Sequence, residues 1–161
     1  MMFWKKKKSK KIVSEILKNK SGQDAIIAID DLLSRIFYKK PEALTDEEKV
    51  IVLIEEYERE INSGGFNQFY FNTSGNYYNN IVDALKKVKS IKFIDLLKKS
   101  STPFPDSIIP SDREKRLKII EEIEDDAEEL WEELEQEFYK YEENIHELVL
   151  QYIRENIEHF R

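Results

Sequence analysis

The chain has 161 residues, near the usual size of one domain, and its 33 acidic against 26 basic residues give a formal net charge of −7. The absence of cysteine excludes a disulfide framework, a thiolate zinc site and a cysteine nucleophile. No segment approaches the roughly 18 consecutive apolar residues that a membrane-spanning helix needs, so we expect a cytoplasmic protein without a membrane span.

Apolar residues recur at helical spacing along most of the chain and never settle into the alternation of a strand. The spacing predicts helices over residues 3–19, 24–38, 45–63, 78–88, 91–97, 111–138 and 145–158. This pattern predicts an all-α fold, a compact single-domain bundle of about six to eight helices with a short aromatic turn between two of them. We expect residues 1–20 to form a lysine-rich, helical N-terminal extension and residues 21–161 to form the single domain.

Local signals mark several helix ends. "TDEE" at residues 45–48 and "SDRE" at residues 111–114 are capping boxes, in which a hydroxyl side chain and an acidic side chain satisfy free amides at a helix start. Pro41 closes the second predicted helix. Gly64 and Gly65 are predicted to end the third, because glycine accepts positive φ without a Cβ clash.

The stretch "INSGGFNQFYFNTSGNYYNN", residues 61–80, concentrates aromatic and carboxamide side chains. Phe66, Phe69 and Tyr70 fall on one face of a helical turn, where they can wedge between longer helices. We interpret this turn as architecture, with its amides satisfying backbone groups that a broken helix leaves unpaired. The alternative is a small-ligand or enzyme pocket within residues 67–80, lined by Asn67, Gln68, Asn72, Asn76, Asn79 and Asn80 beside Tyr77 and Tyr78.

Charge is distributed unevenly along the chain. Residues 1–20 hold eight lysines and one glutamate, whereas residues 121–143 hold thirteen carboxylates and one lysine. Along about 35 Å of helix these carboxylates give one charge per roughly 2.7 Å, and duplex DNA carries one per about 1.7 Å. The candidate partner-binding residues are Glu121, Glu122, Glu124, Asp125, Asp126, Glu128, Glu129, Glu132, Glu133 and Glu135.

Two further interpretations of these charges stay open. The acidic helix can serve as a solvated face that keeps the protein in solution, and the N-terminal lysines can fold back onto it. The segment "FWKKKKSKK" can contact nucleic acid or an anionic membrane, although we favour a solubilising tail and expect no direct nucleic-acid binding.

Catalysis and metal binding find little support in the sequence. His146 and His159 lie 13 residues apart, so they do not form the i, i+4 pair of a helical metal site. Carboxamides are poor acids and bases, and exposed carboxylates lack the burial that separates an acid from a base. We predict a protein that is not an enzyme and has no metal or cofactor.

The run "EINSGGFNQFYFNTSG", the later "SDREKR", the glutamate-rich helix and the terminal "YIRENIEHF" resemble a bacterial domain-of-unknown-function family that includes the neisserial DNA-mimic protein. The resemblance spans about residues 30–161 and leaves out the lysine-rich start. Its signature falls on Asn62, Gly64, Gly65, Phe66, Gln68, Asn72, Ser74 and Gly75, to which we assign a structural role.

This resemblance implies an all-helical fold and, for at least one member, competition with DNA for a helix-turn-helix transcription regulator. The sequence therefore predicts an acidic protein-binding module, a DNA mimic that blocks the DNA-binding face of a transcription regulator or another basic nucleic-acid-binding protein. The sequence leaves the partner's identity open, and a homo-oligomer is compatible with it.

Overall fold

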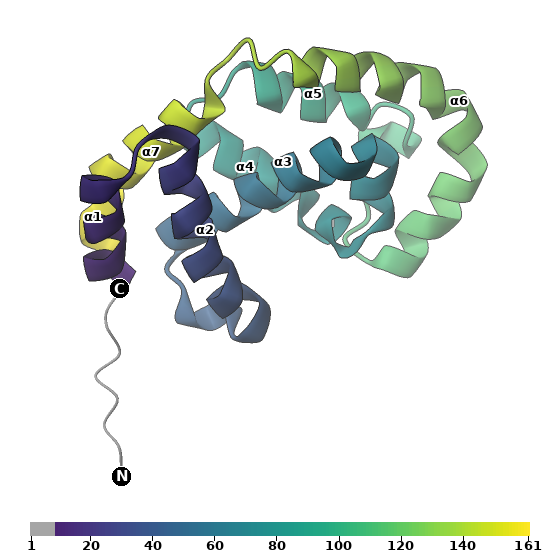
Figure 1. Cartoon of the computed structure of the whole chain (residues 1–161). Helices are drawn as coiled ribbons and strands as arrows, with labels where there is room; N and C mark the ends of the chain where they lie inside the picture. Colours follow the sequence, from purple (N-terminus) through teal and green to yellow (C-terminus); the bar gives the residue numbers. More distant parts are fainter. Residues whose placement is uncertain (1–8) are drawn as a thin grey trace. The chain divides into compact units, whose positions relative to one another are not determined.

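A computed structural model describes residues 9–161 of the protein (Figure 1). Seven α-helices and four short 3-10 helices, without a strand, make up this described part, which confirms the predicted all-α class. The portion of the first predicted helix over residues 3–8 lies outside the described residues. No helix between residues 9 and 161 combines the length and apolar character needed to cross a membrane.

The observed helices follow the predicted order closely. The α-helices are α1 Ser9–Asn19, α2 Gly22–Lys39, α3 Asp46–Phe71, α4 Tyr78–Lys87, α5 Lys92–Ser100, α6 Arg113–Tyr139 and α7 Ile145–Asn156. The 3-10 helices are η1 Pro41–Ala43, η2 Thr73–Tyr77, η3 Pro105–Ser107 and η4 Ile157–His159.

The chain divides into two compact units. We call residues 1–52 with 146–161 the terminal unit, of which residues 9–52 and 146–161 are described, and residues 53–145 the central unit. Helix α3 begins in the terminal unit and ends in the central unit. The expected division into an extension over residues 1–20 and one domain over residues 21–161 stays a prediction.

The terminal unit contains α1, α2, the start of α3 and α7 after its first residue. Its apolar stripes are fully buried at Val13, Ile26, Ile29 and Leu33, as the 3.6-residue spacing predicts. The capping box at the start of α3 is also confirmed. Thr45 Oγ1 accepts from the Glu48 amide at 3.2 Å, and the Glu48 carboxylate accepts from the Thr45 amide at 2.9 Å.

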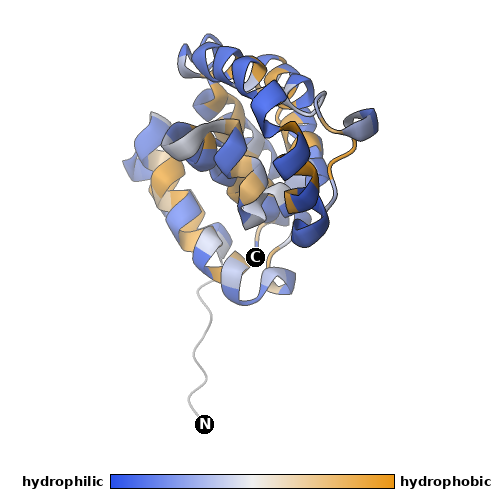
Figure 2. Ribbon diagram, turned by 90° about the vertical axis from the view of Figure 1, so that its right-hand side faces the viewer, coloured by the Kyte–Doolittle hydropathy of each residue, from blue (hydrophilic) through white to orange (hydrophobic). Residues whose placement is uncertain are grey.

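Aromatic side chains fill the core of the central unit. The rings of Tyr57 and Phe69 lie 5.6 Å apart, those of Tyr57 and Phe138 lie 5.4 Å apart, and Tyr70 lies 5.6 Å from Trp131. All these rings are buried, with edge-to-face or tilted geometries that aromatic pairs favour. Figure 2 shows hydrophilic and hydrophobic residues side by side along the helix ribbons.

Helix α3 confirms the predicted helix end at Gly64 and Gly65 and adds one detail. The first helical segment ends at this glycine pair, where Gly65 has the non-helical angles φ 75° and ψ −169°, and a second helical segment runs on to Phe71. Gly65 thus has the positive φ that was expected to end the helical segment at this glycine pair. The two helical segments meet at Gly65 without an intervening loop.

Candidate protein-binding surface

Helix α6 carries all ten predicted partner-binding residues, and its N-cap lies one residue later than predicted. Asp112, not Ser111, is the N-cap, and its carboxylate accepts from the Lys115 amide at 2.9 Å. Aspartate and serine are both good N-caps, so the "SDRE" pattern alone does not decide between them. The apolar stripe of α6 is buried, which turns the carboxylates between its members outward.

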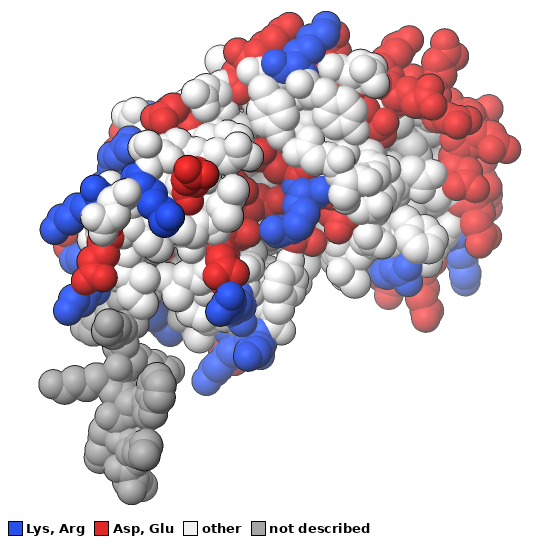
Figure 3. Space-filling view, in the orientation of Figure 1, with Lys and Arg blue, Asp and Glu red and all other residues white. Residues whose placement is uncertain are grey.

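Nine of the ten predicted partner-binding carboxylates are exposed. We call them together the acidic surface: Glu121, Glu122, Glu124, Asp125, Asp126, Glu128, Glu129, Glu132 and Glu133. Figure 3 shows acidic side chains gathered over α6 at the right of the view. Within residues 9–161 none of these nine forms an ion pair. The lysines that the described part contains therefore leave this surface unneutralised.

The carboxylates of the acidic surface lie closer together along α6 than the carboxylates of the whole acidic run, residues 121–143. Nine carboxylates fall within the 13 residues from 121 to 133. At a rise of about 1.5 Å per residue they occupy about 20 Å, or one charge per roughly 2.2 Å. Duplex DNA presents one negative charge per about 1.7 Å of its axis. A basic protein face therefore meets a similar linear charge density on both.

A hollow of about 290 Å³ lies beside the acidic surface, between the kink of α3 and the middle of α6. Gly64 and Asn67 line it from α3, and Trp131 contributes an aromatic side chain from α6. The Asn67 amide nitrogen approaches Glu124 Oε2 at 3.5 Å. The remaining lining residues are carboxylates, Glu124, Asp125, Glu128, Glu132 and Glu135.

Glu135 differs from the nine exposed carboxylates because it is half-buried and has a partner inside the protein. Its Oε1 accepts from the Phe66 amide at 2.7 Å, directly after the kink at Gly65. A Cβ on Gly65 would overlap this carboxylate, so the glycine also makes room for the contact. Burial raises the pKa of Glu135, the Phe66 hydrogen bond lowers it and nearby Glu132 raises it, with a net upward shift.

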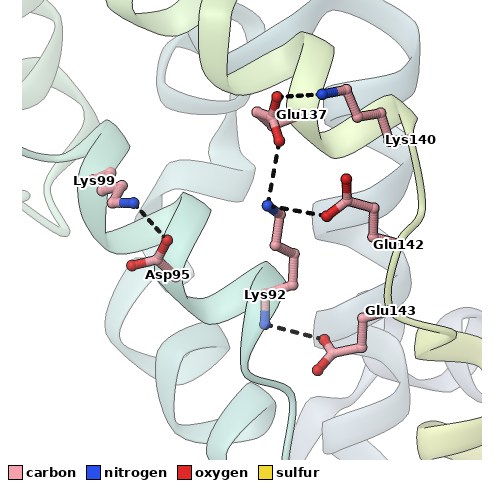
Figure 4. Close-up of polar contacts among 7 residues, drawn as sticks. All are labelled: Lys92, Asp95, Lys99, Glu137, Lys140, Glu142 and Glu143. Carbon is pink, nitrogen blue, oxygen red and sulfur yellow. Dashed lines mark hydrogen bonds and ion pairs between the residues drawn. The ribbon is translucent and has the colours of Figure 1, made fainter.

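Like Glu135, the later carboxylates of the acidic run have partners within the central unit. Glu137 pairs with Lys140 at 2.5 Å and with Lys92 at 3.2 Å, and Lys92 also lies 3.4 Å from Glu142 (Figure 4). The hydrogen bonds from Lys140 and Lys92 lower the pKa of Glu137. Hydrogen bonds to Glu137 and Glu142 raise the pKa of Lys92. Glu137 and Glu142 are therefore neutralised by lysines of the central unit.

Glu143 has a structural task at the start of α5. Its carboxylate accepts from the Ile91 amide at 2.7 Å, the Lys92 amide at 3.3 Å and the Ser90 hydroxyl at 2.6 Å. The first amides of a helix lack partners within the helix, and a negative charge there also favours the helix dipole. Glu143 thus caps α5 from a distant part of the sequence.

The signature residues make contacts within the fold. The amides of Gln68 and Asn72 both donate to Glu60 Oε2 at 3.0 Å, and Asn62 donates to the Tyr141 hydroxyl at 2.8 Å. The Ser74 hydroxyl donates to the Phe69 carbonyl at 2.7 Å. Of these four bonds only that of Ser74 satisfies a backbone group. The three amides bond to side chains instead, which differs from the expected pairing with backbone groups but still ties the turn to neighbouring residues.

Arg116 is a residue that the sequence interpretation missed. Its side chain is fully buried and donates to the carbonyls of Tyr70 at 2.6 Å, Asn72 at 2.9 Å and Pro110 at 2.8 Å, and to Asn76 Oδ1 at 2.8 Å. A Cβ at the signature glycine, Gly75, would collide with the guanidinium. The signal was present, because Arg116 lies four residues before Ile120 on the buried stripe.

The alternative of an amide-lined ligand pocket receives less geometric support. Asn79 and Asn80 are exposed, while Asn76 is held by Arg116. Among the six amides considered, only Asn67 lines the hollow beside α6. That hollow is dominated by carboxylates, which favour a cationic or amide-donating partner over a neutral apolar ligand.

Comparisons with known proteins add one match. The model of a family described as DMP19-like protein matches residues 42–156. No curated protein and no solved structure matches the chain. The matched range covers the signature turn and the whole of α6.

Proposed function

Because the chain belongs to the DMP19-like protein family, we propose that the acidic surface of α6 occupies the DNA-binding face of a basic protein and so competes with DNA. The proposed partner is a helix-turn-helix regulator or another nucleic-acid-binding protein. The function requires association alone, without catalysis.

One observation carries this proposal: nine neighbouring carboxylates are exposed and have no ion pair within residues 9–161. Carboxylates four residues apart on a helix repel each other by a few tenths of a kcal/mol. Within residues 9–161 no lysine pairs with these nine carboxylates to offset this cost, whereas Lys92 and Lys140 pair with Glu137. An external cationic surface would supply the missing counter-charges.

The mechanism is electrostatic competition. A DNA-binding face carries lysine and arginine side chains placed to meet phosphates, and the acidic surface offers oxygen acceptors at comparable linear density. Complementary charge accelerates encounter and fixes orientation, while salt screens exposed charges with a Debye length of about 8 Å at physiological ionic strength. The association should therefore weaken steeply as salt concentration rises.

The test uses immobilised full-length protein to capture partners from the native cell at low salt, followed by elution with excess duplex DNA. We expect DNA-binding proteins in the DNA eluate. The test variant combines Glu122→Gln, Asp126→Asn, Glu129→Gln and Glu133→Gln, which removes four outward charges while keeping side-chain size. Its capture of the same proteins should fall at least tenfold, because each lost charge removes attraction to the cationic face.

A matched control makes the same change in net charge elsewhere. Asp24→Asn, Glu42→Gln, Asp83→Asn and Glu114→Gln also neutralise four exposed carboxylates, none on the acidic surface. This control should retain capture. Equal capture by both variants, or partners that duplex DNA does not displace, would refute the proposal.

A further inference from the structure

The terminal unit contains a second hollow, unrelated to the acidic surface and larger than the hollow beside α6. Its volume is about 860 Å³, within the range of about 300–1,000 Å³ that is usual for small-molecule sites. Residues from α1, α2, the η1 segment, the start of α3 and the C-terminal segment line it. All of these lie within the terminal unit, and their contacts define the site's chemistry.

Part of the wall of this hollow is apolar. Leu44 and Phe160 are nearly buried, at 4% and 5% exposure, and Ile36 and Ala43 are half-buried beside them. Leu44 follows the short η1 helix, whose Pro41 turns the chain back after α2. An apolar wall of this kind gains free energy by covering hydrocarbon, at about 25 cal/mol per Å² of apolar surface removed from water.

The acidic groups that line the hollow already have partners. Glu48 is fully buried, and its carboxylate accepts from the Ser9 hydroxyl, the Arg161 amide and the Thr45 amide. Glu158 pairs with Lys10 at 2.5 Å. Neither carboxylate needs an incoming cation.

Basic groups remain in excess at the same hollow. Arg35 pairs with Asp31 at 3.0 Å, and an Arg161 guanidinium nitrogen donates to the Ala43 carbonyl at 2.7 Å. Lys39 and Lys40, at the end of α2, are exposed and have no ion pair within residues 9–161. The hollow thus combines an apolar patch with two ammonium groups that have no ion pair within residues 9–161.

We propose that this hollow binds a single-chain amphiphilic carboxylate, such as a medium-chain fatty acid, with its tail against Ile36, Leu44 and Phe160 and its carboxylate at Lys39 and Lys40. A cationic amphiphile would meet repulsion from both lysines. A nucleotide would place a polar sugar and several phosphates against an apolar wall. The proposal is independent of the function proposed for α6.

The test titrates full-length protein with decanoate, kept below its micelle-forming concentration, by isothermal titration calorimetry. Amide chemical shifts recorded by NMR locate the site. We expect saturable binding at one site, shifts at Ala43, Leu44 and Phe160, and a melting temperature that rises with ligand, because a ligand that binds only the folded state stabilises it. Decyltrimethylammonium, with the same tail and opposite charge, should bind at least tenfold more weakly.

Two variants separate the charge from the apolar wall. Lys39→Glu with Lys40→Glu should weaken decanoate binding by about tenfold or more, since two attractions become repulsions. Ile36→Trp should weaken binding by filling the hollow while keeping the lysines. The matched control, Lys86→Glu with Lys87→Glu, reverses two exposed lysines at the end of α4 and should bind normally.

Several results would overturn the proposal. They are an absence of saturable binding, chemical shifts confined to other residues, equal affinity for decyltrimethylammonium, and unchanged affinity of the Lys39→Glu, Lys40→Glu variant. A falling melting temperature would identify decanoate as a denaturant of this protein and would also reject the site. Circular dichroism of each variant establishes that it is folded before its affinity is compared.

Discussion

The acidic run of the central unit has two parts that differ in what their carboxylates contact. The nine carboxylates from Glu121 to Glu133 are exposed and form no ion pair within residues 9–161. From Glu135 to Glu143 the glutamates accept backbone amides or pair with lysines of the same unit. Glutamates make up most of the acidic residues in the first part and all of them in the second. Internal partnering, and not charge density alone, separates the surface available to a binding partner from the part that stabilises the fold.

The largest expected effect on stability comes from the second part, at Glu143. Glu143→Ala removes the acceptor of the Ile91 and Lys92 amides and of the Ser90 hydroxyl. We expect the free energy of unfolding to fall by about 2 kcal/mol, the upper range for loss of a helix cap. Urea unfolding followed by circular dichroism measures it. A change below about 0.5 kcal/mol would show that water replaces Glu143 at these amides without cost.

The helical fold was predictable from the sequence because helix boundaries depend on local chemistry. Apolar spacing, Pro41 and the "TDEE" capping box each act within a few residues, and the structure has helices where they indicate them. The helix end at Gly64 and Gly65 was predictable as well, since glycine signals positive φ, but glycine does not signal that the second helical segment follows without a loop.

The division of the acidic run was not predictable in the same way. The partners of Glu135 and Glu143 are Phe66 and Ile91, which lie 69 and 52 residues away along the chain. Helical periodicity places a side chain on a face of its own helix and says nothing about which distant amide it meets. The spacing along α6 therefore places Glu135 among the exposed carboxylates, although it is half-buried and bonded to Phe66.

An intermediate effect is expected at Glu135. Glu135→Ala leaves the buried Phe66 amide without its acceptor, and we expect a loss of about 1 kcal/mol in the free energy of unfolding. Glu135→Gln keeps an acceptor oxygen for the same amide and carries no half-buried charge, so at neutral pH it should be at least as stable as the wild type. Equal losses in the two variants would mean that the charge of Glu135, and not its acceptor atom, stabilises the kink.

The raised pKa of Glu135 predicts the direction in which the free energy of unfolding changes with pH. The folded-state pKa of Glu135 is raised above its ordinary value of 4.5, so the folded state holds its proton more tightly than the unfolded state. The stability associated with the protonated form is present below that value and is lost as the pH rises through the folded pKa. Glu135→Gln should remove this decline just above pH 4.5, measured as unfolding free energy across that window.

The smallest expected effect lies within the acidic surface and has the opposite sign. Glu129 has four carboxylates at the neighbouring helical positions, Asp125, Asp126, Glu132 and Glu133, so Glu129→Gln relieves repulsion and should stabilise the free protein by a few tenths of a kcal/mol. High salt should abolish the gain because it screens exposed charges.

On the same helix, Glu114→Gln provides the control. Glu114 lies in the first turn and precedes Lys118 by four residues, so its replacement should be mildly destabilising. Urea unfolding at low and high salt compares the two variants. A destabilisation of 1 kcal/mol or more by Glu129→Gln would be large enough to indicate lost internal contacts. The outward carboxylates would then stabilise the fold as Glu143 does. In that case the two parts of the acidic run would not differ.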